Sequence, residues 1–116
     1  HPFAHVMEET PAGELAITYP YFHSPDPVRW DVGDADYADA AYIPQHPSYE
    51  WQWSVGDVLN ALIGAGLQVE FLHEYDRLFF KLYPEMVEGP ERWYTLPQYA
   101  GKLPLLLTLR ARKPAL

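Results

Sequence analysis

Apolar side chains recur at helical spacing in the middle of the chain. The stripe consists of Val55, Val58, Leu59, Leu62 and Ile63. This i, i+3, i+4, i+7 and i+8 pattern predicts an amphipathic helix of about three turns. Ser54 precedes the stripe as an N-cap, and Asp57 complements the positive end of the helix dipole. Gly66 supplies the left-handed residue that ends the helix.

Residues 67–75 alternate between apolar and polar positions, which predicts a strand with one buried face. We expect Leu67, Val69 and Phe71 to lie on the face that packs against the helix. The opposite face is mostly polar. Residues 54–75 therefore form a helix–strand block, the building unit of an α/β protein.

A β-rich insertion is predicted before this block, at residues 14–42. Residues 14–22 alternate as a short strand ended by Pro20. Residues 28–32 predict a second strand, and the chain from Gly33 is expected to turn and run back. The insertion is dense in aromatic residues, namely Tyr19, Tyr21, Phe22, Trp30, Tyr37 and Tyr42. Such a set is typical of a lid over a flat apolar ligand, and equally of a small core without a helix.

Three aromatic residues alternate immediately before the helix. They are Tyr49, Trp51 and Trp53, which face the same way if the segment is extended. Two interpretations fit this pattern. The rings form the wall of a pocket, or they pack against the start of the helix.

The last predicted element is a closing strand at residues 103–112. Leu103, Leu105, Leu107 and Leu109 lie on one of its faces, and Leu106 makes the middle of the other face apolar. A strand that is apolar on both faces belongs inside a sheet. The connection before it, residues 76–102, is long for a compact domain, so we expect it to contain structure or to serve a function.

Composition and charge restrict the classes of function. A length of 116 residues allows a single domain or fragment, and 48% hydrophobic residues indicate a folded chain. The net charge of −8 would repel a phosphate backbone, so nucleic acid is not expected as a partner. We see no membrane span and no apolar leader, and the absence of cysteine fits a reducing compartment. We therefore expect a soluble, cytoplasmic protein.

The sequence contains no self-sufficient catalytic motif. Glycine-rich nucleotide loops, GxSxG and HExxH do not occur. His1 and His5 are four residues apart, but Pro2 favours an extended or turning start and no third ligand follows, so no metal site is expected. Ser48 and His46 lie too close in sequence for a typical nucleophile and base. No catalytic residue is assigned.

A family resemblance is carried by the segments HPFAHV, YPYF, YEWQWSVGDVLNALIGAGLQVEFLHEYD and LPLLLTLRARKP. Together they resemble the C-terminal portion of class I S-adenosylmethionine-dependent methyltransferases of the bacterial small-molecule type. The resemblance implies that residues 54–75 are the last crossover helix and the sixth, edge strand of a Rossmann-like sheet. Residues 103–112 would be the antiparallel closing strand between the fifth and sixth strands. The expected fold class is thus α/β, a C-terminal fragment of that sheet with a β-rich aromatic insertion.

The resemblance also implies roles for parts of the chain. The glycine-rich loop and the acidic residue that hold S-adenosylmethionine belong to an N-terminal half that is missing here. We therefore expect no cofactor-binding residue in this chain and no activity of the chain alone, while the parent protein methylates a small molecule. The implied substrate-binding residues are His1, Phe3, Tyr21, Phe22, Tyr49, Trp51 and Trp53.

A noncatalytic α/β module that binds a ligand or a protein is the alternative. A strand, a glycine-rich turn and a helix encoded upstream of His1 would favour the methyltransferase. Without a fifth strand, residues 103–111 present unpaired backbone groups beside leucine faces. We therefore expect the chain to form a homodimer.

Overall fold

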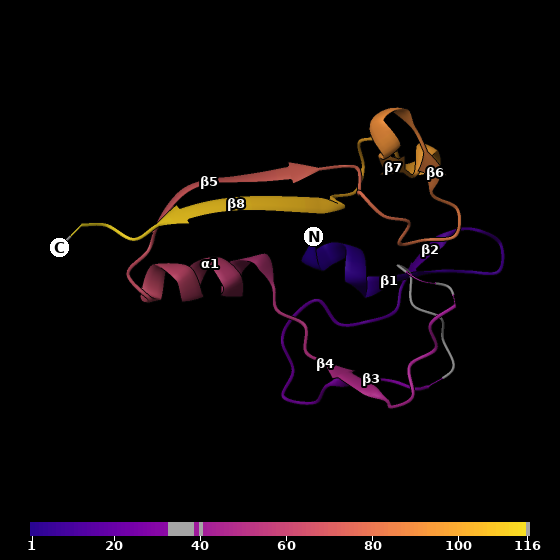
Figure 1. The fold of residues 1–116 in the computed structure, drawn as a ribbon, viewed down its shortest axis with the longest axis horizontal. Coiled ribbons are helices and arrows are strands. Elements are labelled where there is room, and N and C mark those ends of the chain that lie inside the picture. The colour runs from indigo at the N-terminus through magenta and orange to yellow at the C-terminus, as the bar shows by residue number, and fades with distance from the viewer. Residues whose placement is uncertain (33–38, 40, 116) are drawn as a thin grey trace.

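The two longest strands in the described part of the chain pair with each other. A computed structural model describes residues 1–32, 39 and 41–115. Strand β5 (Gln68–Tyr75) and strand β8 (Leu106–Arg112) run antiparallel, with Tyr75 opposite Leu106. Helix α1 (Val55–Gly64) lies alongside this pair (Figure 1). The structure thus has a helix and a strand where the spacing within residues 54–75 predicts them, and β8 begins three residues later than the predicted closing strand.

Ser54 and Asp57 begin α1 with a reciprocal cap. The Ser54 hydroxyl oxygen accepts a hydrogen bond from the Asp57 backbone N–H at 3.1 Å, and the Asp57 carboxylate accepts one from the Ser54 N–H at 3.3 Å. This capping box pairs two N–H groups that have no partner within the helix. Gly66, with φ of +83°, takes the left-handed conformation after the helix. Both predicted end signals are confirmed.

A β-bulge in β5 changes which side chains face α1. The register shifts between Val69 and Phe71, because a bulge places an extra residue on one strand. Leu72 and Leu109 therefore line the apolar space beneath the helix. Phe71 lies on the opposite side, where its ring stacks on His73 with centroids 4.5 Å apart. The prediction that Phe71 packs against the helix is wrong.

Three short antiparallel pairs complete the strands of the described residues. They are β1 (Met7–Glu9) with β2 (Leu15–Ile17), β3 (Val28–Trp30) with β4 (Ser48–Glu50), and β6 (Val87–Glu88) with β7 (Tyr94–Thr95). Both strands of the predicted insertion at residues 14–42 therefore find their partners outside it. The predicted return from Gly33 lies largely outside the described residues. The insertion is therefore not a self-contained β unit. Alternation in the sequence indicates which face of a strand is buried, but it does not indicate which other strand is the partner.

The buried core lies between the N-terminal segment and the long connection. It is formed by Ala4, Val6, Met7, Leu78, Tyr83, Met86, Leu96 and Leu105. Ala4 and Val6 belong to the 3₁₀ helix η1 (Pro2–Val6). The Tyr83 hydroxyl, from the long connection, donates a hydrogen bond to the Ala4 carbonyl. The connection also holds β6, β7 and the 3₁₀ helices η2 (Pro90–Arg92) and η3 (Pro97–Tyr99).

Leu105 corrects one expectation about the closing strand. The sequence predicts that its leucine face lacks cover, yet only 2% of Leu105 is exposed. The chain's own connection surrounds it, since Leu78, Tyr83 and Leu96 belong to the same buried cluster. The beginning of the closing segment is therefore covered from within the chain.

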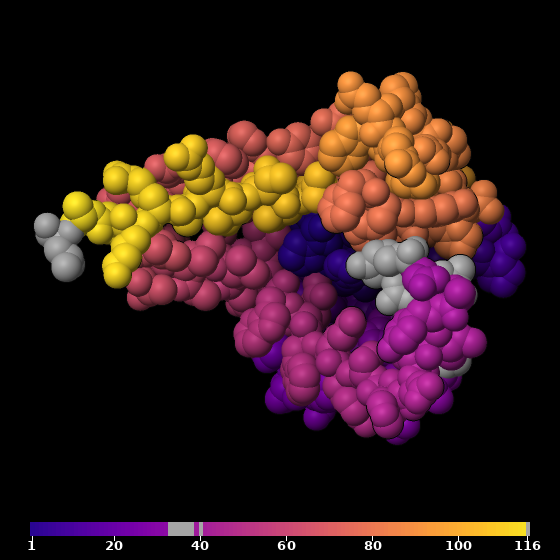
Figure 2. Space-filling model, viewed as in Figure 1, coloured from indigo at the N-terminus to yellow at the C-terminus, as the bar shows by residue number. Residues whose placement is uncertain are grey.

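The molecule exposes more surface than a compact domain of equal mass. Its accessible surface is 8472 Å² at 13.4 kDa, whereas a compact protein of that mass exposes about 6,500 Å². The radius of gyration is 16.5 Å, against about 13 Å for a compact chain of this length. Figure 2 shows α1 and the β5–β8 pair extending as an arm from the rest of the molecule. Val58 and Ile63 on α1 are 40% and 58% exposed, so part of the predicted apolar stripe has no cover.

The architecture is mixed α/β in a coarse sense. The described residues form one α-helix and two-stranded antiparallel sheets. Within the same residues, no helix has the length and apolar character needed to cross a lipid bilayer.

Candidate functional site

A cavity of about 530 Å³ opens beside the β3–β4 pair. We call it the aromatic cavity. Its walls are His5, Tyr19, Pro20, Val28, Trp30, Tyr49, Glu50, Trp51, Gln52 and Trp53. The residues come from η1, from the segment after β2, from both strands of the β3–β4 pair and from the segment that leads into α1. Segments far apart in the sequence thus converge on one hollow.

The β3–β4 pair positions one side of the cavity. Val28 lies opposite Glu50, and Trp30 lies opposite Ser48. The Trp30 indole N–H donates a hydrogen bond to the Glu50 carboxylate at 3.1 Å. The Tyr19 ring lies 5.4 Å from the Trp30 ring between centroids. Trp30 is therefore held by a cross-strand hydrogen bond and by an aromatic neighbour.

The segment between β4 and α1 is fixed by side-chain hydrogen bonds. The Trp51 indole N–H donates to the Pro25 carbonyl at 3.1 Å. The Gln52 side-chain amide donates to the Pro2 carbonyl at 2.7 Å, which ties this wall to η1. These bonds pair the polar parts of both side chains and set the position of the Trp51 ring.

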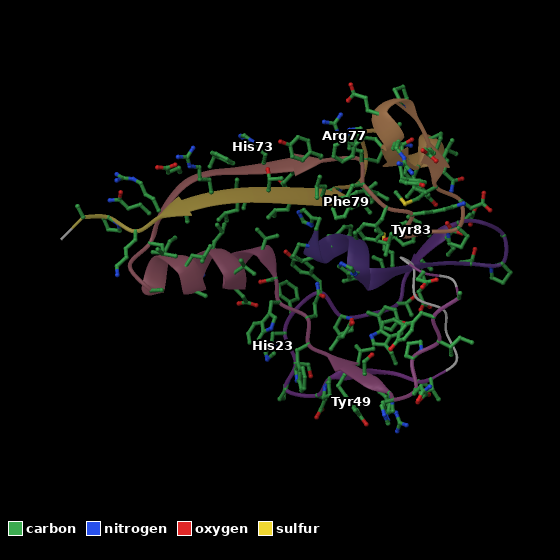
Figure 3. The ribbon with its side chains drawn as sticks, viewed as in Figure 1. His23, Tyr49, His73, Arg77, Phe79 and Tyr83 are labelled. Carbon is green, nitrogen blue, oxygen red and sulfur yellow. The ribbon has the colours of Figure 1, made fainter. Side chains whose placement is uncertain are left out.

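His23 supports the last ring of the wall. Its imidazole stacks on the Trp53 indole, with centroids 3.7 Å apart and an interplanar angle of 11°. His23 Nδ1 also lies 2.9 Å from the Gln52 carbonyl oxygen. Figure 3 shows His23 and Tyr49 in the same lower part of the molecule, away from His73 and Arg77.

The cavity wall has an uneven charge. Its ionisable side chains include the Glu50 carboxylate and the His5 imidazole, and no lysine or arginine lines it among the described residues. Desolvation by the surrounding atoms lowers the pKa of His5, the N-terminal ammonium lowers it further, and Glu50 opposes both effects. The imidazole is therefore mainly neutral at pH 7, while His5 keeps contact with solvent.

Tyr19 adds a neutral phenol at the rim. Its hydroxyl donates a hydrogen bond to the Glu8 carboxylate. That bond, followed by desolvation and the charge of Glu8, raises the pKa of Tyr19 to about 12. Loss of the proton would place two negative charges side by side. Tyr19 thus remains a hydrogen-bond donor throughout the physiological range.

The structure brings together three of the seven residues expected to bind substrate. Tyr49, Trp51 and Trp53 all line the aromatic cavity and are about half exposed, at 50%, 49% and 52%. The alternation does not separate these rings from their neighbours, because Glu50 and Gln52, which lie between them in the sequence, also line the cavity.

The other four lie elsewhere. His1 caps η1, and its Nε2 lies 2.7 Å from the Glu74 carboxylate. Phe3 and Tyr21 meet edge to face with centroids 6.1 Å apart, and both pack against the buried core. Phe22 is 75% exposed and contacts the Tyr21 ring edge to face. None of these four is among the lining residues of the cavity.

Trp30, Glu50 and His5 were missed as site residues by sequence reasoning. Trp30 was recognised only as one of the aromatic residues of the insertion. Its approach to Glu50 depends on the β3–β4 pairing, whose strands lie far apart in the sequence. His5 reaches the wall because η1 is helical, whereas the sequence predicted an extended or turning start. No local pattern in the sequence indicates the Trp30–Glu50 contact, because it depends on the β3–β4 pairing.

The arrangement is suited to binding. Within the described residues, no group of three or more histidine, cysteine or acidic side chains could hold a metal ion. A flat-walled cavity with one carboxylate and one neutral imidazole can hold and orient a small molecule.

Comparisons with family models, curated proteins and solved structures found no match for the chain.

Proposed function

We propose that this chain is the C-terminal, substrate-side segment of an S-adenosylmethionine-dependent methyltransferase that acts on a small molecule. The observation that carries the proposal is the order and direction of three elements. Helix α1 leads into β5, and β8 returns antiparallel beside β5 over most of its length. The family that the sequence resembles has this arrangement in its last helix, its sixth strand and its closing strand.

The position of His1 supports the same proposal. Its amino group donates a hydrogen bond to the Leu105 carbonyl oxygen at 2.9 Å, just before β8 begins. In the resembled fold, the corresponding segment leaves the fifth strand next to the closing strand. The backbone of His1 thus lies beside the start of β8, whose partner strand among the described residues is β5.

The exposed surface gives further support. The excess over a compact protein is about 2,000 Å², which is more than the about 800 Å² that each partner contributes to a specific interface of standard size. An apolar groove of about 320 Å³ runs along α1 and is lined by Trp53, Asp57, Val58, Ala61 and Leu62. In the proposal, the other half of the sheet and its helices cover this surface.

The residues present do not fit a complete site for S-adenosylmethionine. The left-handed glycines Gly13, Gly66 and Gly101 lie in turns, and none belongs to a glycine-rich loop that joins a strand to a helix. Such a loop, with an acidic residue at the end of a neighbouring strand, is what binds a nucleoside cofactor in this type of sheet. The proposal therefore assigns cofactor binding to another part of a longer protein.

The role that remains for this chain is to hold the methyl acceptor. The aromatic cavity fixes the position of a small molecule through Trp30, Tyr49 and Trp51. Alignment of a bound acceptor with a reacting group supplies much of the rate in reactions that need no strong base. The segment would thus act through orientation.

The test uses the complete reading frame of the source gene. Its product is incubated with S-adenosylmethionine labelled in the methyl group and a panel of small amines, phenols and carboxylic acids. We expect label to transfer to at least one compound, and Trp51→Leu to raise KM with a smaller effect on kcat. The matched control is Trp93→Phe, outside the cavity. A product without an upstream glycine-rich turn and without methyl transfer would contradict the proposal.

A noncatalytic ligand-binding module is the second candidate. The observation that favours it is that contacts within this chain already hold the rings of the aromatic cavity, Trp30 through Glu50 and Trp51 through Pro25. Under this alternative, ligand binding by the isolated chain equals that of the complete gene product, and neither binds S-adenosylmethionine.

A further inference from the structure

We propose that the aromatic cavity binds an organic cation, such as a quaternary ammonium or a protonated amine, against Trp30, Tyr49, Trp51 and Glu50. This inference deepens the proposed function, on which it rests only for the role of the ligand as the methyl acceptor. The methyl group would then go to an atom that bears a lone pair: another nucleophilic atom of a quaternary ammonium ligand, or an amine nitrogen after its proton has passed to water. The binding itself needs nothing beyond the chain described here.

The aromatic rings are the first reason. The faces of tryptophan and tyrosine attract cations through the ring quadrupole, and tryptophan does so most strongly. Trp30, Trp51 and Trp53 supply three indoles to one wall, and Tyr49 adds a phenol. The N–H groups of Trp30 and Trp51 already donate to Glu50 and to Pro25. These two indoles therefore offer a ligand their ring faces more than their polar edges.

The charges of the wall are the second reason. Glu50 places a carboxylate among the rings. His5 adds little positive charge at pH 7, because its pKa is lowered. Arg29 follows Val28 in β3, but its guanidinium Nε lies 2.9 Å from the Asp31 carboxylate. The local field thus favours a positive ligand, as does the net charge of −8.

Preorganisation is the third reason. Three rings of the wall are held by contacts that do not involve a ligand: Trp30 by Glu50, Trp51 by Pro25, and Trp53 by stacking on His23. A site whose rings are already fixed loses less side-chain freedom when it binds. A structural cluster in a core would be buried, whereas Tyr49, Trp51 and Trp53 are about half exposed.

The size of the cavity limits the ligand. A volume of about 530 Å³ lies within the range of small-molecule sites, about 300 to 1,000 Å³. A trimethylammonium or methylammonium head fits such a space with room for a short polar tail. Because the walls stay partly hydrated, each ring contributes at the lower end of the cation–π range.

The experiment titrates the 116-residue chain with choline and with 3,3-dimethylbutan-1-ol by isothermal calorimetry. The second compound has the same shape as choline but lacks its charge. We expect saturable binding of choline, and we expect the neutral compound to bind at least about fivefold more weakly than choline. Equal affinities, tighter binding of the neutral compound or no saturation by choline would overturn the proposal.

Variants locate the binding. Trp51→Leu and Glu50→Gln are each expected to weaken choline binding about fivefold. Trp93→Phe is the control, because the Trp93 ring lies 4.5 Å from the Arg77 guanidinium and does not line the cavity. Circular dichroism checks that each variant is folded. If Trp51→Leu does not fold, Tyr49→Leu tests the same wall, and unchanged affinity in folded wall variants would refute the assignment.

The outcomes separate this inference from the proposed function. Choline binding in the cavity, without methyl transfer by the complete gene product, supports the cation site and contradicts the methyltransferase. Methyl transfer by a protein whose cavity shows no preference for cations supports the methyltransferase and overturns the cation site.

Discussion

The amino group of His1 donates a hydrogen bond to the carbonyl oxygen of Leu105, 2.9 Å away. This bond joins the first residue to the segment that enters β8. The His1 side chain strengthens the connection, since its Nδ1 accepts from the Phe3 N–H at 3.0 Å and its Nε2 lies 2.7 Å from Glu74 on β5. The N-terminal residue is therefore fixed against β5 and against the residue that precedes β8.

We predict that His1→Ala destabilises the protein by about 1 to 2 kcal/mol, because it removes the cap of η1 and the contact of the imidazole with Glu74. The measurement is urea unfolding at pH 8. His46→Ala is the control, since His46 is exposed, and its effect should stay within about 0.5 kcal/mol. Equal effects of the two substitutions would show that the His1 contacts contribute nothing.

A second prediction compares two leucines. Leu105 is 2% exposed in the core, so Leu105→Ala is expected to cost about 2 to 5 kcal/mol. Leu62 on α1 is only partly buried and borders the open groove. We expect Leu62→Ala to cost about half as much. A larger loss for Leu62 in chemical denaturation would mean that α1 is more deeply packed than the structure shows.

A third prediction concerns alkaline pH. Burial, followed by the charge of Glu9, raises the pKa of Tyr83 to about 12, while an unfolded tyrosine ionises near 10. The folded state therefore binds the proton more tightly, so this stabilisation is complete below pH 10 and is lost as the pH rises towards 12. We expect Tyr83→Phe to reduce the loss of stability over that interval.

The same substitution also removes the hydrogen bond from Tyr83 to the Ala4 carbonyl. At pH 8 it should cost about 1 to 3 kcal/mol. Tyr19→Phe should change the pH dependence in the same direction, because the pKa of Tyr19 is also raised to about 12, first by its hydrogen bond to Glu8. Urea unfolding at pH 8 and above pH 10 measures both effects, and a Tyr83→Phe variant that loses as much stability above pH 10 as the unchanged chain would contradict this account.

Local signals explain what the sequence predicted well. Ser54, Asp57 and Gly66 define the ends of α1 through contacts within a few residues, so the pattern alone locates the helix. The bulge before Phe71 was not predictable, because a period of two contains no sign of an extra residue. Because of the bulge, Phe71 lies on the side of β5 away from α1, whereas the sequence pattern placed it on the side that faces the helix.

The candidate site likewise combines features that a local pattern predicts with features that it does not. The alternation of Tyr49, Trp51 and Trp53 fitted either a pocket wall or packing against the start of the helix, and in the structure all three line the aromatic cavity. Trp30 reaches them only because β3 pairs with β4 across a long stretch of sequence. Phe3 was expected in the site, but η1 directs it towards Tyr21 and the core. A pairing distant in sequence therefore decided the position of Trp30, whereas a local 3₁₀ helix decided that of Phe3.

A fourth prediction concerns self-association. Phe71 and His73 form an exposed stacked pair on the side of β5 away from α1, and no further strand of the described residues pairs with the outer edges of β5 and β8. We expect the isolated chain to form a homodimer at high concentration, detected by light scattering. Phe71→Glu should shift it to the monomer, whereas Val87→Glu, at another exposed position, should not. A monomer at every concentration would contradict the idea that this surface requires cover.

The central claim is that the chain supplies the substrate side of a methyltransferase and that another segment holds the cofactor. Titration calorimetry with S-adenosylmethionine tests it most directly, with the isolated 116-residue chain and the complete gene product measured side by side. The account predicts saturable binding by the complete product at micromolar concentrations and no saturable binding by the isolated chain. Saturable micromolar binding by the isolated chain, or its absence in both, would contradict the account.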